Sequence, residues 1–208
     1  MPRTTHPLHL LTVLLLSTPS LADLGATPDL VLNGGFEQGM PPAAADWGIW
    51  PPRNAREGVS SEMDGDVRHS GQFSGRLRVT NPAFDGVCTW HHPAAPVEPG
   101  QEIVVQFWIK AEGVKGSCGM DVQLREGVQQ IVGGRATASW TGTFDWRRET
   151  HRFIVPEGVD HICLVPLLRG TGTVWFDDVS AYGTPTVTCS TVEDAPEIDG
   201  LLSEACWD

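Results

Sequence analysis

Lysine and tyrosine are scarce in this sequence, which contains two Lys and a single Tyr among its 208 residues. Lys and Arg together number 14 against 26 Asp and Glu, so the formal net charge at pH 7 is −12. The chain also lacks any basic cluster of the kind that attracts phosphates or anionic lipid headgroups. The composition therefore argues against a nucleic-acid partner and favours a neutral ligand or a cation.

Long apolar runs are absent as well. The stretch from Leu8 to Leu16 is shorter than the ~20 residues that cross a bilayer as a helix, so we expect no membrane anchor. Arg3 precedes this stretch, and the small residues Ser20 and Ala22 follow it, which is the layout of a cleaved secretory signal. We therefore expect residues 1–22 to be a signal peptide and the protein to be secreted to an extracellular location.

Paired cysteine motifs are missing, although the chain has five cysteines. They are Cys88, Cys118, Cys163, Cys189 and Cys206, and none forms a C-x-x-C, which leaves no zinc knuckle or thioredoxin-like redox pair. An odd number in an exported protein means that one thiol is free or that one partner is missing, and the pairing stays open. Cys163 lies in an apolar run, which predicts a buried, structural role.

Helical periodicity is absent too, and short β-type runs separated by Gly, Pro, Asn and Asp follow the signal. In Glu102 to Lys110 the apolar residues alternate, and the face that carries Phe107 and Ile109 must be core. The pattern predicts an all-β antiparallel β-sandwich, most simply a jelly roll, and excludes a parallel α/β fold because crossover helices are missing. The expected strands are Leu30 to Leu32, Ser74 to Thr80, Val87 to His92, Glu102 to Lys110, Cys118 to Arg125, Gln130 to Ala138, Glu149 to Val155, His161 to Leu168 and Thr173 to Tyr182.

Four motifs occur in order along the chain. They are Asn33-Gly-Gly-Phe-Glu37, His69-Ser-Gly-Gln-Phe-Ser-Gly-Arg-Leu77, Pro99-Gly-Gln-Glu-Ile-Val-Val-Gln-Phe-Trp-Ile-Lys-Ala111 and Val174-Trp-Phe-Asp-Asp-Val179. Together they resemble carbohydrate-binding modules of the family 4/9/16/22 type, which share a galactose-binding-like jelly roll. The resemblance covers about residues 29–183.

The tail from Ala195 to Trp207 resembles the opening strand and turn of a family 9-like sugar-binding module. This implies a multi-modular parent protein, in which we expect the present chain to be monomeric. The predicted organisation is a signal peptide at 1–22, a β-sandwich at 23–183, a linker at 184–194 and the truncated start of a second module at 195–208.

The number of tryptophans suits a sugar ligand, because a pyranose offers flat C–H faces to aromatic planes and hydroxyls to polar side chains. Eight tryptophans are present, too many large side chains for all to be hidden in so small a core. Alternation in Val87 to His92 places Cys88, Trp90 and His92 on one face and Val87, Thr89 and His91 on the other. The resemblance implies a carbohydrate-binding set of Trp50, Trp90, His92, Gln123 and Arg125, in which Gln123 and Arg125 share a strand face.

Each of these assignments has a structural alternative. A Trp in a β-sandwich is more often core than ligand platform, and Trp108 and Trp175 favour the core or its rim. For His91 and His92 the alternative is a hydrogen-bonded surface histidine.

The resemblance also implies a structural calcium ion, Ca2+, which takes several oxygen ligands. Carboxylates would come from Glu37 and Asp177, and further oxygen ligands from Gly35, His69 and Asp66. Asp178 is the adjacent alternative to Asp177, and turn-capping acids are the alternative to a metal site altogether. An EF-hand is excluded because Glu62 to Asp66 lacks the twelve-residue, helix-flanked loop.

The expected function is non-catalytic binding of a polysaccharide or oligosaccharide. No Gly-x-Ser-x-Gly elbow, His-Glu-x-x-His or phosphate loop is present, and no pair of acids stands out as the two carboxyls of a glycosidase. An extracellular adhesion or protein-interaction sandwich is the alternative, and a glycoside hydrolase is a further one.

Overall fold

The computed structural model describes residues 28–184, which form β-strands and no helix. No segment within this range forms a helix that could cross a membrane. The predicted signal peptide at 1–22, the second module at 195–208 and all but the first residue of the 184–194 linker lie outside the described residues.

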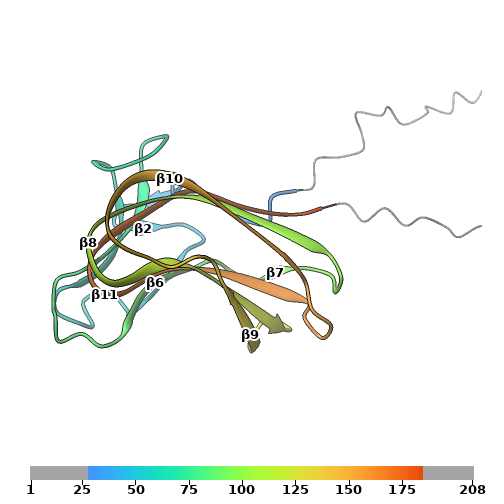
Figure 1. Ribbon diagram of the computed structural model, residues 1–208. Helices are drawn as coiled ribbons and strands as arrows, with labels where there is room; N and C mark the ends of the chain where they lie inside the picture. The colour runs from blue at the N-terminus through green and yellow to red at the C-terminus, as the bar shows by residue number, and fades with distance from the viewer. Residues whose placement is uncertain (1–27, 185–208) are drawn as a thin grey trace, which may run out of the picture.

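Every strand pairs antiparallel with its neighbours, as the alternation predicted. The strands are β1 (Gly39–Met40), β2 (Ala43–Ala44), β3 (Gly48–Trp50), β4 (Val59–Asp64), β5 (Ser74–Val79), β6 (Val87–His91), β7 (Ala95–Pro96), β8 (Glu102–Glu126), β9 (Gln130–Ala136), β10 (Trp140–Ile154) and β11 (His161–Gly183). Apart from the small β1–β2 ribbon, they form one continuous hydrogen-bonded sheet folded into two layers (Figure 1).

The two layers share the long strands β8 and β11. In the first layer the order is β10, the first half of β8, the second half of β11, β5 and β4. In the second layer β9 pairs with the second half of β8, which pairs with the first half of β11, followed by β6 and β3. The long strands turn from one layer to the other at the left of Figure 1, so the antiparallel sandwich is confirmed.

Glycines make this turn possible where β8 and β11 bend together. Gly116 and Gly170 are register partners, with φ angles of 123° and 80°. A Cβ atom on Gly116 would lie 2.3 Å from the Arg169 carbonyl oxygen, and one on Gly170 would lie 2.0 Å from that of Lys115. Only glycine combines this backbone conformation with so close an approach.

The core lies between the two layers and contains the predicted face of β8. Ile103, Val105, Phe107 and Ile109 are fully buried in it. Cys163 is 2% exposed, which confirms the prediction that it is buried. Within residues 28–184, Cys88, Cys118 and Cys163 are all buried thiols that form no disulfide with one another.

Three strand predictions differ from the structure, two because separate runs join into one strand and one because the run is no strand. The runs Glu102 to Lys110 and Cys118 to Arg125 are a single strand, as are His161 to Leu168 and Thr173 to Tyr182. The glycines between them produce a bend with continued pairing rather than a chain break. Leu30 to Leu32 is no strand, although the Leu30 N–H donates a 2.7 Å hydrogen bond to the Ala181 carbonyl.

Candidate functional site

The outer face of the second layer collects polar side chains from four strands. On β8, Asp121 and Gln123 point away from the core while Val122 and Leu124 are buried in it. The register of β8 with β11 sets Val165 beside Asp121, and that of β11 with β6 sets Leu167 beside Thr89. Alternation along antiparallel strands therefore brings residues that are distant in sequence onto one face.

Two adjoining hollows cross this face, one of about 270 Å³ and the other of about 280 Å³. They share Asp121, Leu167 and Arg169, and we call them together the groove. The groove crosses the four strands β3, β6, β11 and β8 and ends at the chain just beyond β9, a distance of roughly 19 Å for four strand spacings. Its lining consists of Trp50, Val87, Thr89, His91, Ser117, Gly119, Met120, Asp121, Gln123, Thr137, Ala138, Ser139, Val165, Leu167 and Arg169.

The centre of the groove combines an apolar floor with a separated charge pair. Val165 and Leu167 form the floor and are almost fully buried. The Arg169 Nη2 and Asp121 Oδ2 atoms lie 3.9 Å apart, too far for a hydrogen bond. Burial raises the pKa of Asp121, and the Arg169 charge partly offsets this rise. Arg169 can therefore donate hydrogen bonds to a ligand that lies over Leu167, and Asp121 can accept them from it.

Gly119 deepens the groove beside this pair. It is the register partner of Leu167, and a Cβ atom there would lie 2.9 Å from the Ala138 carbonyl oxygen. The space without a side chain is bordered by Ser117, Thr137 and Ser139. A polar substituent of a ligand would find hydroxyl partners there.

Gln123 and Arg125 share the outer face of β8, as predicted. Arg125 donates a 2.6 Å hydrogen bond to the Gln123 side-chain oxygen and another of 2.6 Å to the Val128 carbonyl. These bonds fix the amide of Gln123, which lines the groove. Gln123 thus lines the groove, whereas Arg125 lies next to it on the same strand face and is not part of the lining. The role of both residues in binding stays a prediction.

Trp50 stands at the opposite end of the groove on the edge strand β3. It is 58% exposed and is the register partner of Thr89 on β6. A large aromatic surface open to water is what stacking on an apolar ligand face requires. The structure therefore leaves Trp50 available for the predicted role.

The prediction that Trp90 and His92 contact the ligand was wrong. Trp90 is 0% exposed and packs at 5.5 Å from the Phe36 ring centre, while His92 is 4% exposed. The His92 Nε2 atom accepts a 2.8 Å hydrogen bond from the Leu32 N–H, and Nδ1 lies 2.8 Å from the Pro93 carbonyl oxygen. Their strand face is the core face, and both ring nitrogens of His92 are engaged within the protein.

His91 lines the groove where His92 had been expected. It lies on the outward face of β6 with Thr89, whose hydroxyl is 3.2 Å from the His91 Nε2 atom. Burial lowers the pKa of His91, and the charge of Arg125 lowers it further. The neutral imidazole is thus favoured, with one donor and one acceptor nitrogen.

Trp175 and Trp108 lie in structural settings, as the sequence favoured. Trp175 is buried, and its indole N–H donates a 2.9 Å hydrogen bond to Asp64 Oδ2. The half-buried Trp108 stacks on the His69 ring with a centroid distance of 3.7 Å. One face of the Trp108 indole is therefore covered by the protein itself.

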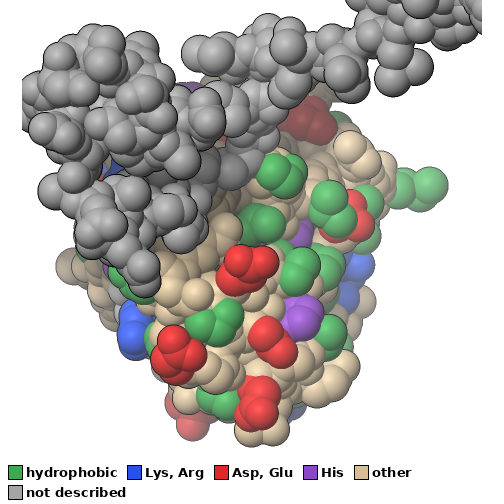
Figure 2. Space-filling view, turned by 90° about the vertical axis from the view of Figure 1, so that its right-hand side faces the viewer, with side chains coloured by type: hydrophobic (Ala, Val, Ile, Leu, Met, Phe, Trp, Pro, Cys, Tyr) green, Lys and Arg blue, Asp and Glu red, His purple; other side chains and the backbone are tan. Residues whose placement is uncertain are grey.

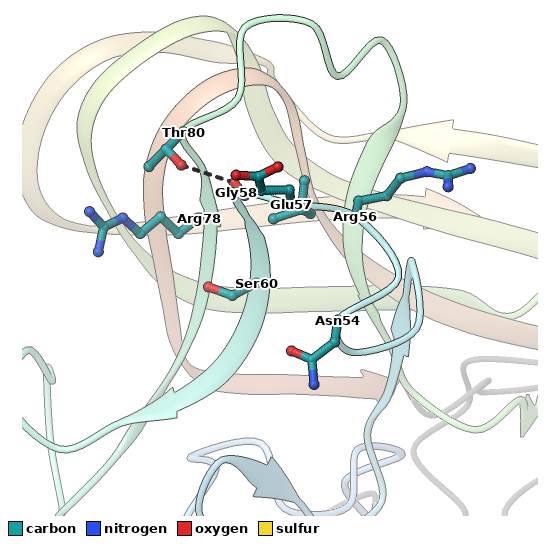
Figure 3. Close-up of a pocket in the computed structure, with 8 residues that line it drawn as sticks. Asn54, Arg56, Glu57, Gly58, Ser60, Arg78 and Thr80 are labelled. Carbon is teal, nitrogen blue, oxygen red and sulfur yellow. Dashed lines mark hydrogen bonds between the residues drawn. The ribbon is translucent and has the colours of Figure 1, made fainter.

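A larger hollow of about 390 Å³ lies outside the groove, between β4, β5 and the preceding loop. Figure 3 shows that the Arg56 and Arg78 side chains point away from each other and away from the centre of this hollow. Within its lining, the Thr80 hydroxyl and the Thr80 N–H both donate hydrogen bonds to the Gly58 carbonyl oxygen. Because no aromatic surface lines it and its charges diverge, we assign it no binding role.

The predicted calcium ligands come together only in part. Asp177 Oδ2 accepts hydrogen bonds from the His69 and Ser70 N–H groups, and Glu37 accepts from the Gln72 and Phe73 N–H groups. Gly35 lies between these acids, since a Cβ atom there would be 3.6 Å from Glu37 Cγ and 3.9 Å from Asp177 Oδ1.

Asp66 does not join this group. It is exposed, and its N–H donates to Asp64 Oδ1. Among the described residues no three His, Cys, Asp or Glu side chains are grouped closely enough to hold a metal. A cation here would need backbone oxygens in addition to Glu37 and Asp177.

Asp177 is 0% exposed, and burial raises its pKa to about 6. The adjacent Asp178 raises it further, against the lowering effect of the Ser70 and His69 N–H donors. A buried carboxylate with an acidic neighbour is a fitting partner for a cation, so the residues present are compatible with one.

Comparison with solved structures identifies the fold. The xylan-binding CBM22-1 domain of Xyn10C from Paenibacillus barcinonensis superposes with a TM-score of 0.53 at 13% identity, over 78% of this chain and 98% of that domain. A family 16 carbohydrate-binding module gives 0.52 at 16% identity, over 73% and 98% of the two chains. This chain has the jelly-roll fold of carbohydrate-binding modules. No protein-family model and no curated protein matches the sequence.

The carbohydrate-binding-module fold also occurs within a larger protein. The enzymatically active domain of tailspike protein 4 from bacteriophage CBA120 gives a TM-score of 0.57 at 16% identity. This chain covers 21% of that domain, with 75% of its own residues matched. The match thus concerns about a fifth of the tailspike domain.

Proposed function

We propose that this protein binds a polysaccharide or oligosaccharide without cleaving it, as part of a secreted multi-modular protein. The observation that carries the proposal is the groove, in which the exposed Trp50 indole, the Leu167 floor and the Arg169–Asp121 charge pair share one sheet face. Such a surface matches a sugar, whose ring faces are apolar and whose edge carries hydroxyls.

The shape of the groove favours a chain-like ligand. It crosses four strands, and the β9 residue opposite Gln123 is Gly134, which has no side chain to block the end of the groove. The xylan-binding domain with this fold is named for a polymeric ligand, which supports the same class of ligand here.

Charge favours a neutral glycan. Figure 2 shows the end of the sandwich at the right of Figure 1, with Asp and Glu side chains over its centre and Lys and Arg near its margins. The net charge of −12 acts in the same direction, because it repels polyanions at long range.

Binding without cleavage is supported by the acids of the groove. Glycosidases use two carboxyl groups facing one bond across roughly 5 to 10 Å. Among the described residues that line the groove, Asp121 is the one carboxylate.

Affinity electrophoresis in gels that contain soluble xylan, β-glucan, glucomannan or galactan tests the proposal. We expect at least one polysaccharide to retard the wild type and Arg169→Gln to abolish most of the retardation. Arg78→Gln is the matched control, since Arg78 lies outside the groove, and it should migrate as the wild type does. Release of reducing sugar, or equal retardation of both variants, would contradict the proposal.

We further propose that a structural Ca2+ binds between Glu37 and Asp177, with backbone oxygens from Gly35 and His69. The ion would be a positively charged partner for the buried Asp177 carboxylate. It would also join the N-terminal segment to the C-terminal part of β11. The convergence of Gly35, Glu37 and Asp177 around the 69–73 turn supports this proposal.

Thermal unfolding with Ca2+ and with a chelator tests the calcium proposal. We expect Ca2+ to raise the unfolding temperature of the wild type and of Asp145→Asn, whose carboxylate is on the surface. The rise should vanish in Asp177→Asn and in Glu37→Gln. An identical unfolding temperature of the wild type in Ca2+ and chelator would show that no such site exists.

A further inference from the structure

A further hollow, of about 250 Å³, adjoins the groove at Trp50. We call it the edge pocket. Its walls include Trp50, Pro51, Ala55, Arg56, Phe84 and Asp85. Trp50 lines both the edge pocket and the groove, so the two spaces meet at this residue.

The walls of the edge pocket are held together by hydrogen bonds between two loops. The Asn81 side-chain amide donates to the Glu57 carbonyl at 3.3 Å, and the Thr80 N–H donates to the Gly58 carbonyl at 2.7 Å. These bonds tie the loop that follows β5 to the loop that precedes β4. The edge pocket is thus formed by connected segments rather than by one free loop.

Phe84 is positioned within the edge pocket by its own backbone. Its N–H donates to the Asn81 carbonyl at 3.1 Å, and its ring lies against Gly86, where a Cβ atom would be 2.6 Å from Phe84 Cζ. A residue with a side chain at position 86 would displace the ring. The half-buried ring therefore stays beside Trp50 and Pro51 as part of an apolar wall.

Polar groups complete the lining of the edge pocket. The exposed side chains of Arg56 and Asp85 border it, and the Arg56 Nη1 group donates to the Ala55 carbonyl. An apolar wall bordered by a guanidinium and a carboxylate repeats the chemistry of the groove, where Trp50 and Leu167 accompany Arg169 and Asp121. Both spaces therefore suit the same kind of ligand, an amphipathic sugar ring.

From this continuity we propose that the edge pocket is an additional sugar subsite. A glycan chain in the groove continues past Trp50 and places a further neutral sugar unit against Phe84 and Pro51. This inference rests on the proposed function and extends it, since the ligand must then be long enough to occupy both spaces.

The test is a substitution that fills the edge pocket and leaves its lining side chains Trp50, Phe84 and Arg56 unchanged. Ala55 is exposed and lines the edge pocket, so Ala55→Trp places an indole in that space. Ala83→Trp is the matched control, because Ala83 is exposed on the neighbouring loop and lines none of these hollows. Arg169→Gln reports on the groove itself.

Affinities are measured by calorimetry for xylo-, gluco- and galacto-oligosaccharides of increasing length, from the disaccharide upward. We expect wild type and Ala83→Trp to gain affinity up to the longest oligomers of the series that binds. Ala55→Trp should bind short oligomers normally and lose about fivefold or more for the long ones. Arg169→Gln should weaken all lengths.

Equal affinities of Ala55→Trp and wild type at every length would overturn the edge subsite and leave the groove intact. Loss of affinity at every length in Ala55→Trp would also overturn it, since Ala55 would then act on the groove. If no oligomer binds the wild type, the proposed function fails, and the edge subsite fails with it.

Discussion

Among individual side chains, Trp50 and Trp90 occupy opposite environments, although their strands, β3 and β6, pair with each other. Trp50 is mostly open to water at the end of the groove, whereas Trp90 is sealed beneath Phe36 in the core. The two indoles should therefore differ in what their removal affects.

We expect Trp50→Ala to lower polysaccharide affinity at least about tenfold, with little change in unfolding temperature. Trp90→Ala should instead cost about 3 to 5 kcal/mol of stability, because it opens a cavity in the core. Trp146→Ala is the control, since Trp146 is partly exposed and lies outside the groove. Affinity electrophoresis and urea unfolding measure both effects, and unchanged binding in Trp50→Ala would remove Trp50 from the site.

His92 gives the stability a defined pH dependence. Burial lowers its pKa, so protonation favours the unfolded chain, where the pKa is about 6.5. The contribution of His92 is complete above that pH and decreases as the pH falls below it, by up to about 1.4 kcal/mol for each pH unit.

His92→Gln isolates this effect, because Gln can keep both hydrogen bonds and does not titrate. The stability advantage of the wild type over His92→Gln should shrink between pH 7 and pH 5 in urea unfolding. Contributions from other acids and histidines cancel in this difference. A constant difference across this range would contradict the assignment.

Of the five residues that the sequence predicted for sugar binding, Trp50 and Gln123 line the groove, while the strand face chosen for Trp90 and His92 is the buried one. Alternation correctly separated Cys88, Trp90 and His92 from Val87, Thr89 and His91, but it does not say which set is buried. The residue types do favour burial of the first set, since Cys and Trp make it the more apolar one and an imidazole is also readily buried. Asp121 and Arg169 were missed because their separation of 48 positions becomes a contact only through the β8 and β11 register.

At the scale of elements, the bend shared by β8 and β11 determines where the groove can form. The bend lets one pair of strands supply the core of both layers and brings Arg169 toward the groove immediately before Gly170. Runs of alternating residues were recognised from the sequence. The sequence did not show that neighbouring runs join into one long strand, because a glycine in a strand pattern indicates a bend or a strand end equally well.

Replacing the bend glycines should therefore destabilise the whole sandwich. We expect Gly116→Ala and Gly170→Ala each to lower the free energy of unfolding by at least about 1 to 3 kcal/mol, since the new Cβ atom would overlap a backbone carbonyl. Gly134→Ala is the control, because the nearest atom to a Cβ there is 3.7 Å away. Urea unfolding measures all three, and equal stabilities would contradict this account of the bend.

At the scale of the whole molecule, the net negative charge acts on charged partners at long range and contributes little to the recognition of a neutral sugar. Surface charge acts through a screened field, whereas hydrogen bonding and stacking to a neutral glycan are local. Retardation by a neutral polysaccharide should therefore change little between low salt and about 0.5 M NaCl. A strong loss with salt would indicate a charged ligand instead.

The most direct test of the sugar-binding groove is nuclear magnetic resonance of the tryptophan indole N–H signals during titration with a retarding polysaccharide or its oligomers. The account predicts that the Trp50 signal shifts with ligand concentration, while the signals of the buried Trp90 and of Trp108, on the opposite layer, stay in place. A titration in which Trp108 or Trp146 shifts and Trp50 does not would place the ligand on the other face and contradict the central claim.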